Sequence, residues 1–291
     1  MILFLIYFSP LIIAIYSLID TRKTNKKIYG KKILVIGGSS GLGYSFLRIL
    51  KKLGNNVTGT SRDMDYIDEK NEDGLYKFIQ LDVCKDSTFE KGPTDYDFIF
   101  YCTGACIPGD FDDRTAEDHI LMTNTNYIGM IKVLKHYSNV NSKPFHFSMV
   151  GSTLALFQIP GYSTYTPTKS AILSFFYTTY KEFKRKKIRL HLFNPSNMKT
   201  KGFERENRIK DEYNKLLEKF LNTMSPDECA EYFLENMFYR KVVVTDYFTY
   251  FCQIRHECEK FVDYLFFPIS IVVVFAAKML CGIFYKIRCF L

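Results

Sequence analysis

A tyrosine and a lysine four residues apart form the pattern with the clearest chemical meaning in this sequence. They are Tyr165 and Lys169, in the run Tyr165-Thr166-Pro167-Thr168-Lys169. Residues i and i+4 share one face of a helix, so the phenol and the ammonium can reach the same bound molecule. A nearby cation favours the phenolate and brings the tyrosine pKa down from ~10 toward the working pH. Such a tyrosine can protonate a carbonyl oxygen as hydride arrives, or remove the proton in reverse.

The same spacing recurs elsewhere in the chain, so context must select the reactive pair. Tyr165 alone has a serine thirteen residues upstream, Ser152, just beyond a predicted strand. Tyr165 alone also begins its helix at the carboxyl edge of the predicted sheet, where ligands of such folds bind. We therefore expect Tyr177 and Tyr180 to be packing or surface residues. The competing pairs are Tyr66–Lys70, Tyr177–Lys181 and Tyr180–Lys184.

A glycine-rich loop follows the first predicted strand and opens a helix. It reads Gly37-Gly38-Ser39-Ser40-Gly41-Leu42-Gly43. Gly37 allows a sharp exit from the strand, Gly41 lets backbone approach a pyrophosphate, and Gly43 lets the helix pack on the sheet. The helix N-terminus adds free N–H groups and a positive dipole end. The loop predicts a dinucleotide site, and the alternative is a tight structural turn.

The second predicted strand ends in Ser61 and Arg62 rather than in the carboxylate that usually holds the ribose 2′-hydroxyl of NAD. A guanidinium pairs with a 2′-phosphate, so Arg62 favours NADPH as the cofactor. Asp63 follows at once and weakens this inference, and the alternative for Arg62 is a solvated loop charge. Asp82, before Val83 at the end of the third strand, can accept from the adenine amino group or make an Asx turn.

Asn126 lies within a long predicted helix, Ala116–Tyr137. Its amide can hold a water molecule or mark a helix kink, and the alternative is a solvated helix residue. After the fourth predicted strand, the run Cys102-Thr103-Gly104-Ala105 puts small residues, Gly104 among them, beside the cofactor.

Short β-rich runs alternate with helical patterns from Lys32 to about Thr245. Runs such as Ile33-Leu34-Val35-Ile36 are continuously apolar, which suits strands covered on both faces. The alternation predicts an α/β fold, a doubly wound Rossmann-type parallel sheet in a single domain over residues 32–250. The predicted strands are Lys32–Gly37, Asn56–Thr60, Tyr76–Asp82, Phe98–Thr103, Pro144–Met149, Arg189–Asn194 and Lys241–Thr245. The predicted helices are Gly41–Leu53, Ala116–Tyr137, Tyr162–Arg185, Gly202–Phe220 and Pro226–Phe238.

The N-terminal run from Met1 to Ile19 contains no charged side chain and is followed by a basic cluster between Arg22 and Lys32. At ~1.5 Å per residue, a helix over this run is long enough for the hydrocarbon core of a bilayer. We expect a membrane anchor over residues 1–20, the alternative being a cleaved signal peptide. Positive residues favour the cytosolic side, so the body of the protein should face the cytosol.

A second apolar region runs from Tyr264 to Tyr285, interrupted by Lys278. A lysine near the centre is costly in a simple membrane span. We therefore expect residues 261–291 to form a membrane-associated segment that is interfacial or re-entrant. The alternatives are a span, a buried C-terminal helix or a subunit interface.

Composition excludes a disordered or fibrous protein, since 47% of the 291 residues are apolar and 24% are charged. The net charge of +8 suits an anionic membrane or a phosphorylated small molecule as partner. The clearest basic run of the chain adjoins the expected membrane anchor, which explains that run, so we expect no nucleic-acid partner. The eight cysteines form no C-x-x-C pair and the five histidines are scattered, so no metal site is expected.

Together, the glycine loop, Asn126, Ser152, Tyr165 and Lys169 resemble the short-chain dehydrogenase/reductase family in order and spacing. The resemblance implies that Lys169 also binds the nicotinamide ribose and that Asn126 holds a proton-relay water. It implies that Ser152 positions the substrate carbonyl, and that Pro195 and Thr200 contact the cofactor. The departures are Ile36 for the usual threonine, Cys102-Thr103-Gly104-Ala105 for the usual N-[NC]-A-G, and Pro195-Ser196 for the usual Pro-Gly.

Finer features resemble one subfamily, the 3-ketodihydrosphingosine reductases. They lie in Gly104–Phe111, Gly161–Tyr165, Thr200–Asn207 and Ser225–Ala230. This resemblance implies NADPH-dependent reduction of the C3 ketone of a lipid-like substrate at the endoplasmic reticulum membrane, with the catalytic domain facing the cytosol. It also implies a possible homodimer through Ala116–Tyr137 and Tyr162–Arg185. The alternatives are a membrane-bound reductase of steroid, retinoid or fatty-acyl ketones, and a cofactor-binding scaffold without chemistry.

Overall fold

A single parallel sheet organises the described part of the chain. The structure is a computed structural model that describes residues 28–70, 75–85, 88, 94–219, 221 and 223–290. The expected anchor at residues 1–20 lies outside this part. The seven parallel strands are ordered β3-β2-β1-β4-β5-β6-β9, so the predicted doubly wound fold is confirmed. They are β1 (Lys32–Ile36), β2 (Asn56–Ser61), β3 (Lys77–Gln80), β4 (Phe98–Tyr101), β5 (Phe145–Val150), β6 (Ile188–Asn194) and β9 (Val242–Val244).

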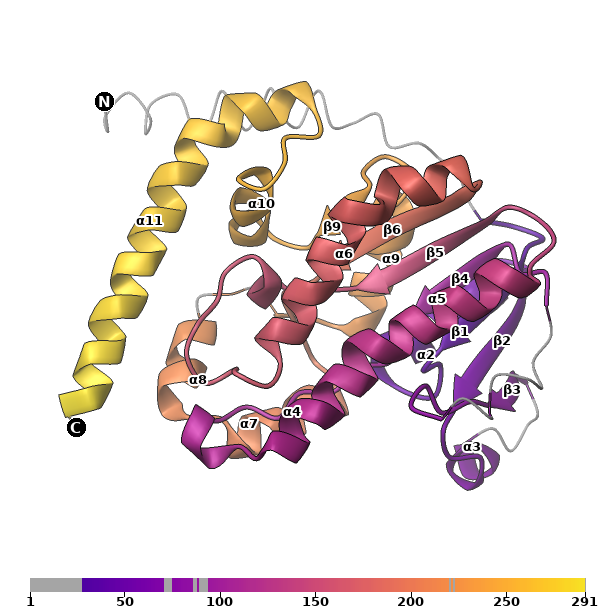
Figure 1. Ribbon diagram of the computed structural model, residues 1–291, viewed down its shortest axis with the longest axis horizontal. Coiled ribbons are helices and arrows are strands. Elements are labelled where there is room, and N and C mark those ends of the chain that lie inside the picture. The colour runs from indigo at the N-terminus through magenta and orange to yellow at the C-terminus, as the bar shows by residue number, and fades with distance from the viewer. Residues whose placement is uncertain are drawn as a thin grey trace.

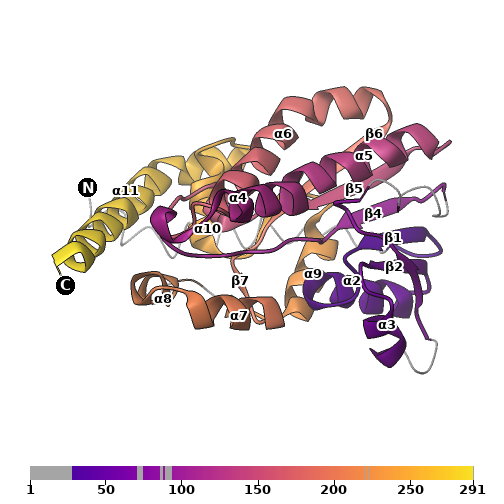
Figure 2. The same cartoon turned by 60° about the horizontal axis from the view of Figure 1, so that its bottom comes forward.

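Helices cover both faces of the sheet because successive strand residues point to opposite sides. Leu34 and Ile36 pack toward α5 and α6, whereas Ile33 and Val35 pack toward α2 and α9. Figure 2 shows α5 and α6 on one face and α2 and α9 on the other. The helices of these layers are α2 (Gly41–Lys52), α3 (Asp65–Lys70), α4 (Ala116–Thr123), α5 (Gly129–Val140), α6 (Thr166–Arg185) and α9 (Pro226–Asn236).

The sheet reverses direction of winding between β1 and β4, which are neighbours although β2 and β3 intervene in the chain. In open α/β sheets, the crevice at the carboxyl ends of the strands beside such a switch point is where ligands bind. The loops after β1, β4 and β5 all leave the sheet at this edge, and they carry the glycine loop, Gly104 and Ser152.

Two predicted helices are wrong in detail. The expected Ala116–Tyr137 helix contains a π-helical turn, η3 (Asn124–Ile128), between α4 and α5. The expected Gly202–Phe220 helix is two helices, α7 (Lys201–Ile209) and α8 (Glu212–Glu218). The break occurs because Lys210 is extended and Asp211 caps α8 by accepting from the Tyr213 N–H at 2.6 Å. The short strands β7 (Asn197–Met198) and β8 (Thr223–Met224) pair beside them.

The C-terminal apolar region is one continuous helix, α11 (Phe261–Phe290), with Pro268 inside it. A continuous helix does not turn back on itself as a re-entrant segment would, and the interfacial arrangement stays a prediction. A helix α10 (Tyr247–Ile254), which was not predicted, packs against α11 (Figure 1). Within Phe261–Arg288 an 18-residue stretch has a mean hydropathy of 2.2, and by length and composition the helix could cross a membrane.

The start of α11 is fixed to the domain through Asp263, which is fully buried. Its carboxylate accepts from both Arg240 guanidinium N–H groups at 3.1 and 3.2 Å, and from the Tyr250 hydroxyl at 2.7 Å. The other end is fixed by Arg288, which pairs with Asp110 at 2.6 Å and with Asp211 at 2.7 Å. The helix thus spans from α10 to the loops beside α8.

Candidate active site

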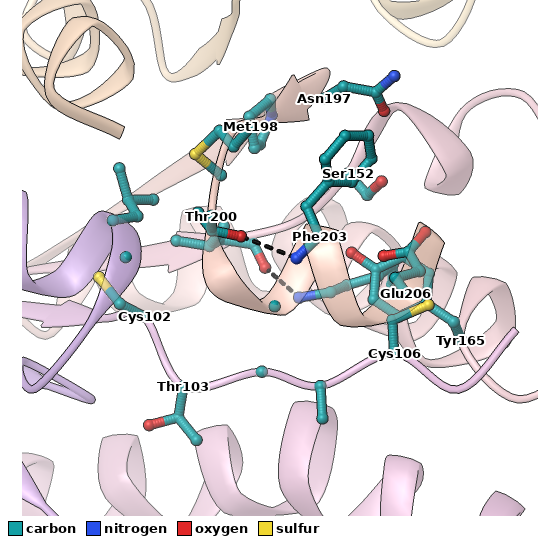
Figure 3. A pocket seen from close by; sticks show the side chains of 18 of the residues that line it. Cys102, Thr103, Cys106, Ser152, Tyr165, Asn197, Met198, Thr200, Phe203 and Glu206 are labelled. Carbon is teal, nitrogen blue, oxygen red and sulfur yellow. Dashed lines mark hydrogen bonds between the residues drawn. The ribbon is translucent and has the colours of Figure 1, made fainter. Parts of the chain in front are cut away.

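A cavity of about 1500 Å³ opens at the carboxyl edge of the sheet. It is larger than most small-ligand pockets, which hold ~300–1000 Å³, and so has room for a dinucleotide and a second ligand. Figure 3 shows Ser152, Tyr165, Thr200 and Thr103 around it. Gly43 and Asn126 are not lining residues of the cavity, but Gly43 packs against Gly37 and Asn126 is hydrogen-bonded to Ala105, and both Gly37 and Ala105 line it. The predicted site residues that line it are Gly37, Ser39, Ser40, Gly41, Leu42, Arg62, Asp82, Val83, Gly104, Ser152, Tyr165, Lys169, Pro195 and Thr200.

The glycine loop has the geometry that its sequence predicts. Gly37 and Gly41 have φ values of +76° and +52°, a conformation that other residues adopt with strain. A Cβ on Gly43 would lie 2.1 Å from the Gly37 carbonyl oxygen, so only glycine permits this approach of helix to strand. Ser40 is the N-cap of α2, yet its side chain makes no capping hydrogen bond. The helix N-terminus is therefore left uncapped at the cavity, as an anion-binding site requires.

Tyr165 and Lys169 stand at the beginning of α6, with Pro167 in the first turn. The Lys169 side chain is 4% exposed, and its ammonium donates to the Val150 carbonyl oxygen at 2.9 Å. Burial lowers the pKa of Lys169 to about 8. This carbonyl ends β5, so the strand positions the lysine charge beside the tyrosine ring.

The pKa of Tyr165 is raised, which corrects the expectation that a nearby cation lowers it. Burial is the main cause, and Cys106 and Glu206 raise it further. A hydrogen bond with the Ser152 hydroxyl acts in the opposite direction. Tyr165 is therefore a neutral phenol at ordinary pH, a state suited to giving a proton rather than taking one.

Asn126 occupies the π-helical turn and is fully buried. Its Oδ1 accepts from the Ala105 N–H at 2.8 Å, and its Nδ2 donates to the Ala105 carbonyl and to Thr168 Oγ1, both at 3.0 Å. The amide thus ties the loop after β4 to α6. Sequence reasoning did not predict this π-helical turn, and the alternative of a solvated helix residue is wrong because Asn126 is buried. Its water-holding role stays a prediction.

The polar residues at the far end of the cavity come from the ends of β2 and β3. Arg62 is exposed, and Ser61 is fixed by donating to the Asp63 carbonyl at 2.6 Å. Asp82 Oδ1 accepts from the Cys84 N–H at 3.0 Å, which is the Asx-turn alternative. A guanidinium exposed at the cavity fits a phosphate group.

One charged cluster in the cavity was missed by sequence reasoning. We call Tyr162, Glu206, Lys210 and Glu218 the Glu206 cluster. The fully buried Lys210 ammonium contacts Glu206 at 2.9 Å and Glu218 at 2.6 Å, and the Tyr162 hydroxyl contacts both carboxylates. The only available signal was the i,i+4 spacing of Glu206 and Lys210, because Glu218 arrives through the break between α7 and α8.

Of the three competing tyrosines, Tyr66 on α3 lines the cavity, whereas Tyr177 and Tyr180 make packing contacts. The Tyr177 hydroxyl accepts from the Gln253 amide on α10. The Lys241 ammonium lies 5.4 Å from the centre of the Tyr180 ring. Neither tyrosine lines the cavity.

The family model for short chain dehydrogenases matches residues 31–211. The chain belongs to the short chain dehydrogenase family, as its glycine loop and Tyr165–Lys169 pair indicated. Solved structures agree on the fold. A short chain dehydrogenase/reductase from Burkholderia phymatum in complex with NAD aligns with a TM-score of 0.67 at 17% identity, covering 80% of this chain and 95% of that one. BdcA in complex with NADPH aligns at 0.64 and 18%, covering 75% and 94%.

Several curated relatives have names that state a particular reductase activity. A 3-ketodihydrosphingosine reductase of Debaryomyces hansenii is 28% identical over 74% of this chain and 74% of its own length. One of Dictyostelium discoideum is 27% identical over 78% and 77%. A 3-dehydrosphinganine reductase of Danio rerio is 24% identical over 78% and 74%.

Proposed function

We propose that this protein reduces the C3 ketone of 3-ketodihydrosphingosine to dihydrosphingosine, using NADPH. The observation that carries the proposal is that Ser152, Tyr165 and Lys169 line one cavity, and that the apolar helix α11 forms part of the wall of this cavity. The names of the relatives support the substrate, and the shared family supports hydride transfer.

The residues present fit a nicotinamide dinucleotide. The uncapped start of α2 and the backbone of Gly41 would hold the pyrophosphate. Arg62 would pair with the 2′-phosphate of NADPH, and Asp82 would stand near the adenine. Lys169 would hold the nicotinamide ribose, with Pro195 and Thr200 beyond it. When bound, NADPH supplies the hydride that reaches C3.

Tyr165 acts as the general acid in this proposal. Its phenol gives its proton to the ketone oxygen, and the Ser152 hydroxyl, already hydrogen-bonded to Tyr165, orients that oxygen. The Lys169 cation then stabilises the phenolate that remains. Because burial keeps Tyr165 protonated, the free enzyme is in the protonation state that reduction requires.

The cavity also suits a long acyl chain. Its walls include Leu217 and Leu221 near α8, and Ala277, Leu280 and Phe284 of α11. Several outward-facing side chains of α11 are apolar and exposed, Phe275 by 64% and Ile283 by 51%. Exposed apolar area of this extent marks a contact with membrane or protein. We infer that α11 associates with the membrane from which the chain of the substrate enters.

We propose that the protein resides in the endoplasmic reticulum membrane with its catalytic domain toward the cytosol. The basic cluster between Arg22 and Lys32 supports this orientation. Lys286 and Arg288 at the end of α11 are also basic, and Arg288 is bonded to the domain itself. An interfacial α11 would lie against the membrane and the domain together. This arrangement agrees with the basic cluster on the cytosolic side and with the bonds from Arg288 to the domain.

The proposal is tested by incubating membranes that contain the protein with NADPH and a panel of ketones. The panel holds 3-ketodihydrosphingosine, a steroid ketone, a retinoid ketone and a fatty-acyl ketone. We expect substrate-dependent formation of dihydrosphingosine and the highest kcat/KM for the sphingoid ketone. A higher kcat/KM for another ketone would refute the assigned substrate. NADPH binding without turnover of any member would support the scaffold alternative.

A further inference from the structure

We propose that Glu206, supported by Glu218, binds the ammonium group of the substrate and makes the enzyme selective for 2-amino ketones. The inference rests on the proposed function, because the amino group belongs to that substrate. It assigns to Glu206 a role in specificity that is separate from the chemistry of Tyr165.

Glu206 lies in the right place for this contact. It lines the same cavity as Tyr165, and its side chain is 16% exposed there. Figure 3 shows Glu206, Cys106 and Tyr165 grouped at one end of the cavity, away from Cys102. The Tyr162 ring, whose hydroxyl bonds to Glu206 at 3.0 Å, has its centre 6.4 Å from that of Tyr165. The carboxylate is thus on the Tyr165 side of the cavity, close enough for its charge to raise the pKa of the phenol.

The Glu206 cluster has more acceptors than donors. Two carboxylates offer about eight lone-pair sites, whereas Lys210 has three N–H donors, Tyr162 has one O–H, and the Cys106 thiol, which is hydrogen-bonded to Glu206, adds one S–H. That single hydroxyl proton cannot be donated to Glu206 and Glu218 together, although Tyr162 contacts both. Burial raises the pKa of Glu218, while its bonds with Lys210 and Tyr162 oppose the shift. An incoming ammonium would bring three further donors and the positive charge that balances the second carboxylate.

The local fold is organised around this arrangement. In one continuous helix, Glu218 would stand twelve residues beyond Glu206, about 18 Å away at ~1.5 Å per residue. The break at Lys210 turns α8 back, so both carboxylates reach one ammonium. Lys210 also lies 4.7 Å from the Phe203 ring centre, which fixes it in the apolar wall. The result is a fixed negative site rather than a mobile surface pair.

The chemistry of the substrate matches the position. In a 2-amino-3-ketone, the nitrogen is two bonds from the carbonyl carbon, so a carboxylate that binds it must adjoin the group that protonates the ketone. A charge-assisted hydrogen bond at a desolvated site also discriminates strongly against an analogue that lacks the donor. Steroid and retinoid substrates carry no amino group and gain nothing from Glu206.

The test compares 3-ketodihydrosphingosine with the same long-chain hydroxyketone without the amino group. The full-length protein is assayed in membranes as wild type, Glu206→Gln and Glu218→Gln. Glu204→Gln is the matched control, because Glu204 lies on the same helix and is exposed. We expect the wild-type ratio of kcat/KM for the two ketones to fall about 10- to 100-fold in Glu206→Gln, and less in Glu218→Gln. Glu204→Gln should keep the wild-type ratio.

The outcomes separate this inference from the proposed function. Suppose that wild type reduces the amino ketone and that Glu206→Gln keeps the wild-type ratio of kcat/KM for the two ketones within about threefold. The cluster is then a structural ion pair, and the inference on Glu206 fails while the proposed function stands. If wild type does not reduce the amino ketone, both fail. A second measurement needs no variant: a long-chain primary amine should inhibit wild type about tenfold more strongly than the matching alcohol. Equal inhibition would overturn the inference.

Discussion

The ammonium of Lys169 lies 5.5 Å from the centre of the Tyr165 ring, and it donates to the Val150 carbonyl rather than to the phenol. The strand β5 therefore holds the lysine while the first turn of α6 holds the tyrosine. This arrangement separates two roles. Tyr165 keeps its proton until a ketone oxygen arrives, and Lys169 supplies a fixed positive charge beside the phenolate that forms.

Replacement of the proposed acid should abolish most of the reduction. We expect Tyr165→Phe to lower kcat for ketone reduction by about 10²- to 10⁴-fold, the usual contribution of a positioned acid. Binding of NADPH, followed by its fluorescence, should persist because the pyrophosphate site is intact. Tyr177→Phe is the control and should keep wild-type kcat, since Tyr177 packs on α10. Similar losses in the two variants would contradict the choice of Tyr165.

The charge of Lys169 should set the alkaline limit of activity. Burial lowers its pKa to about 8, so the lysine loses its charge as the pH rises through that value. We expect kcat/KM for reduction to fall above about pH 8, where kcat/KM reports groups of the free enzyme. In Lys169→Arg, which stays charged, the absolute rate should drop and the alkaline fall should disappear. A wild-type profile that is flat through this range would be incompatible with the assignment.

Arg62 should decide between the two nicotinamide cofactors. Its guanidinium is exposed at the end of the cavity where a 2′-phosphate would lie. We expect Arg62→Ala to lower kcat/KM for NADPH by about 10- to 100-fold, the value of a charge-assisted pair. The kcat/KM for NADH should stay near that of wild type. Equal losses with both cofactors would show that Arg62 acts on folding instead of on the phosphate.

A buried histidine pair should make the fold sensitive to acid. His146 Nδ1 and His191 Nε2 are 2.8 Å apart across β5 and β6, with stacked rings. Burial lowers the pKa of His146 to about 4 and of His191 to about 3. As the pH falls, the unfolded chain therefore takes up protons first. Stability is complete above about pH 6.5 and is lost toward pH 4, by about 2 kcal/mol for each histidine at pH 5.

Urea unfolding at neutral and acidic pH measures this loss. The double variant His146→Phe with His191→Phe is the comparison, because phenylalanine keeps the stacked rings without a titrating group. Its free energy of unfolding should change less between the two pH values than that of wild type. Equal changes in both proteins would assign the acid sensitivity to carboxylates elsewhere.

The strands and the glycine loop could be predicted because their signals are local. The run Ile33-Leu34-Val35-Ile36 is apolar on both faces, and Gly37 and Gly41 stand where positive φ is required. Ser152 and Tyr165 followed from where predicted elements end. These features depend on a few neighbouring residues and on the parallel topology that the alternation implies.

The features that were missed depend on tertiary contacts. The π-helical turn at Asn126 is set by bonds to Ala105 and Thr168, and by the Tyr101 hydroxyl, which donates to the Thr125 carbonyl at 2.6 Å. The break at Lys210 depends on Glu218, eight residues onward. Helix periodicity continues through both places and hides them. At Lys210 the local signal is Asp211, a residue type common at helix N-caps, which the periodicity outweighed in the prediction.

The fate of a deuterium label on the cofactor tests the proposed hydride transfer to C3 directly. Membranes containing the protein are incubated with 3-ketodihydrosphingosine and NADPH deuterated at C4 of the nicotinamide, and the dihydrosphingosine formed is examined by mass spectrometry. We expect one deuterium at C3 with wild type, and labelled product reduced to background with Tyr165→Phe. Wild-type membranes that yield no C3-labelled product, with either face of the nicotinamide deuterated, would contradict the proposed hydride transfer.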